Sequence, residues 1–553
     1  MPLDHGKHKK GIYIESDFSD NDLGVARMFG MKVEILIDDV VKYYDWLYTG
    51  KNKDVLDFDL QFNAAAFEKT IVGGYTKGLE SLVNKQDTQP TPSGASHYQT
   101  SLFNTGYYLT YDNMTSELRE ANGDIVIPQS TYMDWNDYYK MDSGKRNLKK
   151  IKIQMGLKCN YSCEYCSQRF VPRNKDDHLD TSDQYHIGDE EVNVYVRKFD
   201  NITVDEKVHF ELWGGEPFLY WKTLQPLVIK LREKFPSCTF SVITNGSMFN
   251  DEIIDWIVKY DIRISISHDG PGQPTRGPDP FDDPEKKKMI MKLINKRANT
   301  KNADGEMESK LSFNSMVHKH NDSRGDIAKW FLNKVGMIMI GEGGTVDAYD
   351  EGGKNMSWST PEEHIGYRKK AINEIISYKT RAFNIQQQKI DNFLMSLHSQ
   401  RPASMLNQKC GMDEPTTMAI DMNGDVTTCQ NVTASSSNTA GISHKIGNIA
   451  DGDEGLAKIK INAGTHWSDR KDCTTCPVLQ ICQGSCLFLA PDSDYWDISC
   501  NNAFSDNVVW LAAALYQLTQ GKLLYRIEGP QNNLSEDRIN IFGFESLENA
   551  NSN

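Results

Sequence analysis

A short stretch that ends in three cysteines decides the fold of this chain: residues 151–166 read IKIQMGLKCNYSCEYC. Apolar residues alternate at Ile151, Ile153 and Met155, and alternation of this kind predicts a strand. The cysteines follow at once with the spacing C-x3-C-x2-C: Cys159, Cys163 and Cys166. The stretch is therefore expected to be a strand that runs directly into a thiol-rich loop.

The spacing of these cysteines points to a metal centre. Three thiolates from one short loop can converge on one small centre, and such soft ligands suit zinc or an iron–sulfur cluster. A closed structural zinc site takes four protein ligands, but the loop has no fourth Cys or His. Three cysteines on a 4Fe–4S cluster would instead leave one iron open, and that iron could chelate an amino acid through its amine and carboxylate.

Strand-like and helix-like segments alternate after this loop. Further strands are expected at 208–212, 239–243, 262–266, 311–317 and 335–340. Helices with apolar residues three or four positions apart are expected at 221–235, 251–260, 284–296 and 326–335. Six strands that alternate with helices imply parallel pairing through right-handed crossovers. The expected fold class is α/β, a partial (β/α)6 TIM-type barrel with its site at the carboxyl ends of the strands.

Seven more cysteines follow the expected barrel. With Gly424 they form C-x13-G-x4-C, then C-x2-C-x5-C-x3-C, then one more cysteine: Cys410, Cys429, Cys473, Cys476, Cys482, Cys486 and Cys500. Pairs of the C-x2-C type also serve zinc, so two structural zinc sites are the alternative to iron–sulfur clusters. Cys238 begins an expected strand and is predicted to be a buried core thiol.

The first cysteine loop and the strand ends after it resemble the radical S-adenosylmethionine superfamily. Its signature is CxxxCxxC with an aromatic residue before the last cysteine, where this chain has Tyr165. A GGEP motif, which the resemblance assigns to the methionine amine, is matched by Gly214, Gly215, Glu216 and Pro217. The resemblance implies further cofactor contacts at later strand ends: Thr244, Asn245, Ser267, Asp269 and Arg276. Among these, Ser267 and Asp269 match a ribose-binding motif, and Arg276 lies where relatives use Arg against the methionine carboxylate.

The second cysteine group resembles the SPASM extension of the same superfamily, including sulfatase-maturing relatives. The resemblance implies two auxiliary 4Fe–4S clusters, which would make three clusters in all. One of them would be held by Cys473, Cys476, Cys482 and Cys500. The other would be held by Cys410, Cys429 and Cys486, which leaves one of its irons without an assigned cysteine.

These patterns predict five regions. Residues 1–146 form an α+β module that recognises the substrate or caps the barrel, and 147–345 form the partial barrel. A helical connector is expected at 346–405, with a strong helix at 361–379. The SPASM region spans 406–503, and 504–553 hold a helix at 507–521 and a polar tail.

The resemblance implies an enzyme that reductively cleaves S-adenosylmethionine to a 5′-deoxyadenosyl radical, which abstracts hydrogen from a peptide or protein. The product would be a crosslink or an oxidation. The alternatives are a radical enzyme that acts on a small molecule and a non-catalytic iron–sulfur or zinc protein. A peptide or protein substrate and a reductant such as flavodoxin or ferredoxin are the expected partners.

The general base is not evident from the sequence. Sulfatase-maturing relatives place an Asp directly after the cysteine that matches Cys429, whereas this chain has Gln430 and Asn431. That departure weakens a formylglycine-forming assignment. The remaining acid–base candidates are each as compatible with a structural role: His209, Glu211, Asp421 and Asp425.

Composition excludes several other classes. A formal net charge of −15 argues against a nucleic-acid-binding surface. No run of about eighteen apolar residues is present, so no membrane span is expected. The basic N-terminus lacks the apolar stretch of a secretory signal, which favours a cytoplasmic protein whose clustered thiols bind metal instead of forming disulfides.

Overall fold

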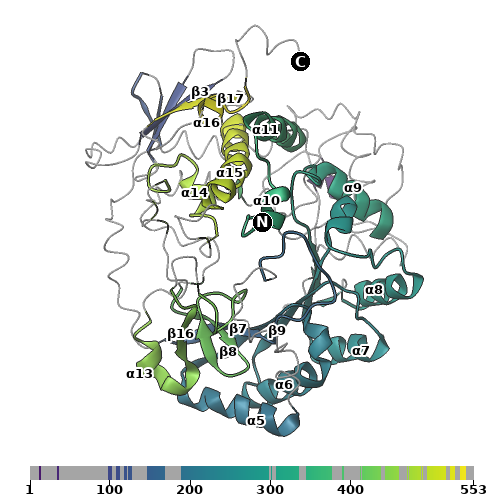
Figure 1. Ribbon diagram of the computed structural model, residues 1–553. Helices are drawn as coiled ribbons and strands as arrows, with labels where there is room; N and C mark the ends of the chain where they lie inside the picture. Colours follow the sequence, from purple (N-terminus) through teal and green to yellow (C-terminus); the bar gives the residue numbers. More distant parts are fainter. Residues whose placement is uncertain are drawn as a thin grey trace.

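Six parallel strands form most of an eight-stranded sheet (Figure 1). In the computed structural model their order is β13 (Leu311–Asn314), β10 (Arg263–Ser267), β9 (Thr239–Thr244), β8 (Val204–Trp213), β7 (Leu148–Gln154) and β14 (Thr417–Asp421). Two antiparallel strands, β15 (Asp425–Thr427) and β16 (Lys445–Asn448), extend the sheet beyond β14. The linear strand order describes an open sheet and no closed barrel within the described part of the chain.

The structure describes most of the sequence after residue 145. The longer ranges are 146–168, 188–297, 307–335, 344–376, 414–437, 442–459, 472–486, 495–518, 523–529 and 536–543. The shorter ones are 12–13, 34–35, 97–102, 108–112, 117–120, 122–127, 300–301, 389–390, 412, 467, 470 and 489. Cys410, most of the expected N-terminal module and residues 336–340 of the expected sixth strand lie outside these ranges.

Helices alternate with the parallel strands and lie along the outside of the sheet in Figure 1. They are α5 (Asp189–Arg197), α6 (Trp221–Lys234), α7 (Asp251–Lys259), α8 (Pro284–Arg297) and α9 (Arg324–Val335). The same region contains short 3-10 helices: η4 (Lys198–Asn201), η5 (Pro217–Tyr220) and η6 (Gly270–Thr275). The α/β class with parallel strands is confirmed. Val335, expected to begin a sixth strand, is instead the last residue of α9.

The two faces of the sheet differ in polarity because side chains alternate along each strand. Ile151, Phe210 and Val242 lie on the face that packs against the helices, and all three are fully buried. The opposite face is polar. There Glu211 of β8 forms ion pairs with Lys150 at 3.0 Å and with Lys152 at 3.5 Å, both on β7. A polar interior of this kind can surround a polar ligand at the strand ends.

The loop after β7 lies against the end of β8, and glycine permits that approach. The backbone N–H of Gly215 donates to the Gly156 carbonyl, and that of Glu216 donates to the Lys158 carbonyl, both at 2.9 Å. A Cβ atom on Gly215 would lie 2.2 Å from the carbonyl oxygen of Lys158. These glycines are therefore needed to pack the cysteine loop, whatever ligand they also face.

A tight hairpin joins the cysteine-rich part of the chain to the barrel sheet. Ile420 of β14 pairs with Ile153 of β7, and β15 returns antiparallel to β14. Gly424 makes the turn at φ +84°, a left-handed conformation that glycine adopts without strain. The glycine of the C-x13-G-x4-C pattern thus has a structural reason, because the turn directs β15 toward Cys429.

The C-terminal half adds helices and one strand that joins four strands of the N-terminal region in a second sheet. The helices are α10 (Glu351–Asn355), α11 (Pro361–Ile376), α13 (Gly452–Leu456), α14 (Leu479–Cys482), α15 (Trp496–Leu518) and α16 (Glu536–Ile539), with a 3-10 turn η8 (Ile449–Asp451). The helix expected at 507–521 begins eleven residues earlier than expected, so α15 also carries Cys500. In the antiparallel second sheet the order is β17 (Leu524–Glu528), β3 (His97–Leu102), β4 (Tyr108–Asp112), β5 (Glu117–Glu120) and β6 (Ile125–Ile127). Two small ribbons pair β1 (Ile12–Tyr13) with β2 (Glu34–Ile35) and β11 (Thr300–Lys301) with β12 (Met307–Glu308).

A buried ionic network ties the barrel to the C-terminal helices. Arg324 of α9 contacts Asp506 of α15 at 2.6 Å, and both side chains are almost fully buried. The Tyr367 hydroxyl of α11 donates to the same carboxylate at 2.7 Å, and Lys389 approaches its other oxygen at 2.9 Å. Asp506 of α15 is thus the shared acceptor of α9, α11 and Lys389.

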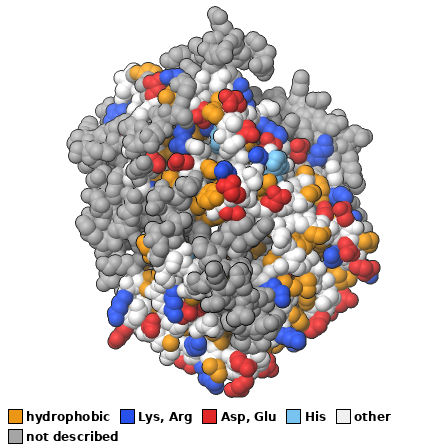
Figure 2. Space-filling view, viewed as in Figure 1, with side chains coloured by type: hydrophobic (Ala, Val, Ile, Leu, Met, Phe, Trp, Pro, Cys, Tyr) orange, Lys and Arg blue, Asp and Glu red, His pale blue; other side chains and the backbone are white. Residues whose placement is uncertain are grey.

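The described surface carries both charges. On the face in Figure 2, acidic and basic side chains are interspersed and neither sign forms a large patch among the coloured residues. None of the described helices is both long and apolar enough to cross a membrane.

We predict that Asp506→Asn lowers the free energy of unfolding by about 3–5 kcal/mol, because it leaves Arg324 as an uncompensated buried charge. Denaturant unfolding would measure the change. The control is Asp255→Asn, which breaks an exposed pair with Lys296 and should leave the unfolding midpoint nearly unchanged. Equal effects of the two substitutions would contradict a structural role for the buried network.

We also predict that Gly215→Ala destabilises the protein by roughly 1–3 kcal/mol or more, because the new methyl group meets backbone that cannot move aside cheaply. Gly366→Ala in α11 is the matched control, since nothing lies within 4 Å of its added Cβ. That control should raise stability by roughly 0.5–1 kcal/mol. Thermal unfolding of both variants checks the prediction, and an unchanged melting temperature for Gly215→Ala would refute it.

Candidate functional site

One cavity of about 720 Å³ opens at the carboxyl ends of the parallel strands. One wall comes from the barrel, and the residues of the cysteine loop and the strand ends that line it include Cys159, Tyr161, Cys163, Cys166, Gly214, Gly215, Thr244, Asn245, Ser267 and Arg276. The facing wall comes from the cysteine-rich region: Asp421, Asn423, Asp425, Thr433, Ala434, Ser435 and Lys445. A cavity of this size is typical of small-molecule and cofactor sites.

Sheet register explains why residues far apart in sequence share this cavity. Gln154 at the end of β7 pairs with Trp213 on β8 and with Asp421 on β14. Paired residues in neighbouring strands point to the same face of a sheet. All three therefore line the cavity, which sits across the junction of the two parts of the chain.

The three cysteines of the first loop share the cavity but do not form a closed cage. Burial raises the pKa of Cys163 to about 11, and the Arg276 guanidinium acts in the opposite direction. Among the described residues, no three His, Cys, Asp or Glu side chains are gathered closely enough for a single metal ion. The argument that a cluster fits here is that three thiols line one cavity beside the Arg276 guanidinium. Three thiols are a donor set that suits an iron–sulfur cluster.

The end of β9 supports the cysteine loop through side-chain amides. Asn245 donates through Nδ2 to Oδ1 of Asn160 at 2.8 Å and lies 4.0 Å from the Cys159 sulfur. Asn160 in turn donates to the Ser247 hydroxyl at 2.8 Å. These bonds orient the loop next to Cys159.

Glu216 lies behind the cavity wall, fully buried. Its carboxylate accepts hydrogen bonds from the Thr244 hydroxyl at 2.8 Å and from the backbone N–H of Asn245 at 2.7 Å. A third bond comes from the Phe218 N–H at 3.2 Å. Burial raises the pKa of Glu216 to about 7, against the pull of these donors. In this arrangement Glu216 links the ends of β8 and β9. Pro217, at the start of η5, is also buried and does not line the cavity.

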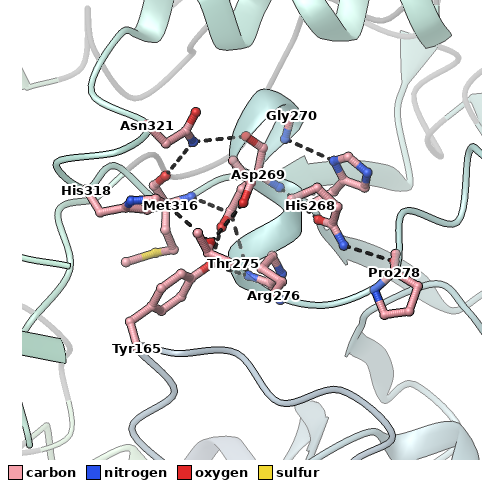
Figure 3. A network of polar contacts seen from close by, with 12 residues as sticks. Tyr165, His268, Asp269, Gly270, Thr275, Arg276, Pro278, Met316, His318 and Asn321 are labelled. Atoms are coloured by element: carbon pink, nitrogen blue, oxygen red, sulfur yellow. Dashed lines mark hydrogen bonds and ion pairs between the residues drawn. The ribbon is translucent and has the colours of Figure 1, made fainter. Parts of the chain in front are cut away.

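Asp269 is the centre of a second buried network, which Figure 3 shows from close by. The Tyr165 hydroxyl donates to one carboxylate oxygen of Asp269, and the backbone N–H of Met316 donates to the other at 2.9 Å. Arg276 donates to the Tyr165 oxygen at 2.9 Å and lies 3.6 Å from Asp269. Asn321 donates to the Asp269 carbonyl at 2.9 Å.

Two more of the expected cofactor contacts do not line the cavity. Asp269 and Tyr165 lie behind the wall, whereas Ser267 and Arg276 line the cavity. Burial raises the pKa of Tyr165 well above its usual value, so its hydroxyl stays a donor. Tyr165 and Asp269 thus hold the Arg276 guanidinium at the cavity wall.

The four acid–base candidates are separated by depth. His209 and Glu211 do not line the cavity. His209 contacts the Thr239 and Ser241 hydroxyls at 2.8 Å, and Glu211 is held by the two lysines of β7. Because Lys152 and Lys150 outweigh its burial, the pKa of Glu211 is lowered. Both side chains are engaged in the polar interior below the cavity.

Asp421 and Asp425 line the cavity but differ in their partners. Asp425 forms an ion pair with Lys445 at 2.7 Å and accepts from Asn448 at 2.6 Å. Asp421 accepts backbone N–H groups, from Asn423 at 2.8 Å and from Asp425 at 2.9 Å. Burial raises the pKa of Asp421 to about 6 despite those bonds. Of the four candidates, Asp421 is therefore the carboxyl best suited to exchange a proton in the cavity.

The described cysteines of the second group differ in their electrostatic partners, although Cys473, Cys486 and Cys500 pack in one small core. The thiols of Cys473, Cys476, Cys482 and Cys500 influence one another electrostatically. Cys486 and Cys429 instead share Tyr349, whose hydroxyl donates to the Cys486 sulfur at 2.9 Å. Cys410, expected to join Cys429 and Cys486, lies outside the described residues.

The binding of the residues after Cys429 to the barrel was not predicted from the sequence. Gln154 donates through Nε2 to the carbonyls of Gln430 and Val432, both at 2.7 Å. Trp213 donates through Nε1 to Oδ1 of Asn431 at 2.9 Å. Gln430 and Asn431, which replace the Asp of sulfatase-maturing relatives, thus join the two walls. Trp213 directly precedes the Gly-Gly pair, and that proximity was the one available signal.

Comparison with known proteins agrees with these observations. Residues 153–302 match the Radical SAM superfamily. The chain is 22% identical over 191 residues to the radical SAM cyclopropyl synthase TigE of Paramaledivibacter caminithermalis, a match that covers 32% of this chain and 40% of TigE. The chain therefore spans about two fifths of the length of this curated relative.

Two solved structures have similar folds. One is native anSMEcpe with bound AdoMet, with a TM-score of 0.46 and 15% identity over 67% of this chain and 98% of that one. The other is SuiB of Streptococcus suis bound to precursor peptide SuiA, with a TM-score of 0.38 and 14% identity over 64% and 74% of the two chains. On the sequence match and the cysteine loop it contains, residues 153–302 of this chain form a domain of the Radical SAM superfamily.

Proposed function

We propose that this protein is a radical S-adenosylmethionine enzyme that modifies a peptide or protein. When bound, a 4Fe–4S cluster and S-adenosylmethionine would supply a 5′-deoxyadenosyl radical that abstracts hydrogen from the substrate. The observation that carries the proposal is the cavity shared by Cys159, Cys163, Cys166 and Arg276. A cluster and S-adenosylmethionine could therefore bind side by side in one cavity. Two auxiliary 4Fe–4S clusters in the second cysteine group are part of the same proposal.

The barrel wall would bind and orient the cofactor. The cysteine thiolates would hold the cluster, and the Arg276 guanidinium would pair with the methionine carboxylate in a charge-assisted hydrogen bond. Asn245, Thr244 and Ser267 offer polar side chains along the same wall. Among the expected cofactor contacts, the side chains behind the wall act by positioning: Tyr165, Glu216, Pro217 and Asp269.

The facing wall would bind the substrate. Its lining is polar and charged, with Asn423, Ser435 and the Asp425–Lys445 ion pair. These groups can pair with backbone amides, which suits an extended peptide. TigE is a cyclopropyl synthase, and structures of anSMEcpe and SuiB have peptides bound. A peptide substrate for this chain remains our inference from the SPASM-like cysteine pattern and this polar wall.

Asp421 would act as the general base in such a modification. Its carboxyl lines the cavity at the junction of β14 and β7. With a pKa of about 6, it is ionised at neutral pH and can still be protonated near working pH. A base with its pKa close to the operating pH transfers protons most effectively.

We predict that Cys163→Ala abolishes release of 5′-deoxyadenosine and lowers the iron content by about four atoms per chain, since a 4Fe–4S cluster has four irons. Cys238→Ala is the control, because that thiol lies in the core away from the cavity. The control should keep its iron and its 5′-deoxyadenosine release. Anaerobic reconstitution, iron analysis and chromatography of the nucleoside measure both. Normal release from Cys163→Ala would sink the proposed function.

The substrate class needs its own measurement. Candidate peptides incubated with reduced, reconstituted protein should show a mass change that depends on S-adenosylmethionine. If 5′-deoxyadenosine release rises with small-molecule substrates and with no peptide, the small-molecule alternative is correct instead.

We predict that product formation on such a peptide falls about tenfold per unit of pH below 6, because the base must be unprotonated and the pKa of Asp421 is about 6. Asp421→Asn should remove this acidic limb of the pH–rate profile and lower the rate of product formation by about 10²–10⁴-fold. Asp425→Asn removes the ion pair with Lys445 but leaves the Asp421 carboxyl in place, so this variant should keep the limb. If the Asp421→Asn variant keeps the acidic limb of the wild-type profile, another residue is the general base.

A further inference from the structure

The two expected sets of auxiliary cysteines receive different hydrogen-bond donors. Arg538 of α16 donates through Nη2 to the sulfur of Cys500 at 3.6 Å. Tyr349 donates its hydroxyl to the sulfur of Cys486 at 2.9 Å. The four-cysteine group is thus approached by a permanent cation, whereas Cys486 in the other group is approached by a neutral phenol.

Arg538 is held in place by the helix that carries the cysteine. Its Nε donates to Oδ1 of Asn501 at 3.1 Å, and Nη2 donates to the same oxygen. Its guanidinium lies over the Phe504 ring, 4.7 Å from the centroid. Cys500, Asn501 and Phe504 all belong to α15. The guanidinium is therefore fixed toward the sulfur before any cluster binds.

Arg470 adds a second cation at the same group. It is almost fully buried and donates to the carbonyls of Gly484 at 2.7 Å and Cys486 at 3.0 Å. Its guanidinium stacks on Trp496, 4.1 Å from the ring centroid. Its electrostatic partners are Cys473, Cys482 and Cys500 of the four-cysteine group and also Cys486 of the other group. Arg470 supports the loop between Cys482 and Cys486 and adds positive charge next to it.

These donors would affect the reduced state of a cluster more than the oxidised state. A cluster that accepts an electron gains one negative charge, and a neighbouring cation stabilises the added charge. Hydrogen bonds to the sulfurs and net charge both set the reduction potential of such clusters. A charge-assisted hydrogen bond is roughly twice as strong as a neutral one. The donor with the permanent charge should therefore have the larger effect.

We infer that Arg538 and Tyr349 stabilise the reduced states of the two auxiliary sites unequally, with the larger effect at the four-cysteine site. The inference rests on the auxiliary clusters of the proposed function. Arg538 and Tyr349 are positioning residues, since each acts on a cluster through a cysteine sulfur. Tyr349 was not singled out by any sequence pattern, and Arg538 belongs to the segment expected to be a polar tail.

The test is a reductive titration of the reconstituted full-length protein, followed by electron paramagnetic resonance. Arg538→Gln should lower the equilibrium constant for one-electron reduction of the four-cysteine cluster about tenfold, which is 59 mV. The signal of the other cluster should not move. Arg538→Lys keeps the charge and should restore part of the shift. Cys500→Ala identifies the signal of the four-cysteine cluster by weakening or removing it.

Tyr349→Phe should shift only the other cluster, about two- to threefold, as expected for loss of a neutral hydrogen bond. Tyr495→Phe is the matched control, because Tyr495 packs in the same small core but donates to Glu351. That control should shift neither signal. Unchanged potentials in both Arg538→Gln and Tyr349→Phe, or equal shifts of both signals in either variant, would overturn the inference.

Iron analysis separates this inference from the proposed function. About twelve irons per wild-type chain, from three 4Fe–4S clusters, are expected under the proposed function. A protein with about four irons that still releases 5′-deoxyadenosine would keep the radical chemistry and refute the auxiliary sites together with this inference. Twelve irons with no shift in either variant would refute the inference alone.

Discussion

The backbone contact between the loop after β7 and the end of β8 is the constraint on which the site depends. Gly215 and Glu216 donate to carbonyls of that loop at 2.9 Å, and no side chain fits at position 215 without displacing Lys158. The contact places the cysteine loop over the polar face of the sheet instead of its apolar face. Once the loop is there, the ends of β9 and β10 supply Asn245 and Ser267 to the same cavity.

Behind that wall, buried polar side chains position the residues that line the cavity. The sequence motif alone would suggest that they contact the cofactor directly. Glu216 and Asp269 are each satisfied by protein donors, so their carboxylates hold strand ends and Arg276 in place. Leaving such a group without partners in the interior would cost several kcal/mol, at roughly 1–3 per unmade bond and more for a charge. Their burial makes the wall rigid, which suits a site that must orient its ligand.

The cavity also depends on a part of the chain that lies more than two hundred residues away. Parallel pairing of β14 with β7 brings Asp421 beside Gln154, and Gln154 and Trp213 bind the backbone and Asn431 after Cys429. The proposed cofactor wall, the substrate wall and one auxiliary cysteine are thereby connected by a few hydrogen bonds. The same pairing separates Asp421 from His209 and Glu211, which are held below it.

The sequence by itself determined the first five parallel strands from 148 to 314 and the helices α6 to α9, because apolar periodicity marks both kinds of element. It did not predict α5. It also placed Cys159, Cys163 and Cys166 on one loop, and the structure brings all three to one cavity. Only the tertiary structure decided that Tyr165 and Asp269 stand behind Arg276, that Asp421 and Asp425 line the cavity whereas His209 and Glu211 do not, and that α15 begins at Trp496. Three buried polar residues, Asn502, Ser505 and Asp506, interrupt the apolar pattern of that helix in the sequence. Their hydrogen-bonding and ion-pair partners come from distant elements: Ser357, Arg368 and Arg324. Contacts between segments far apart in sequence depend on sheet register and burial, and local periodicity carries no information about either.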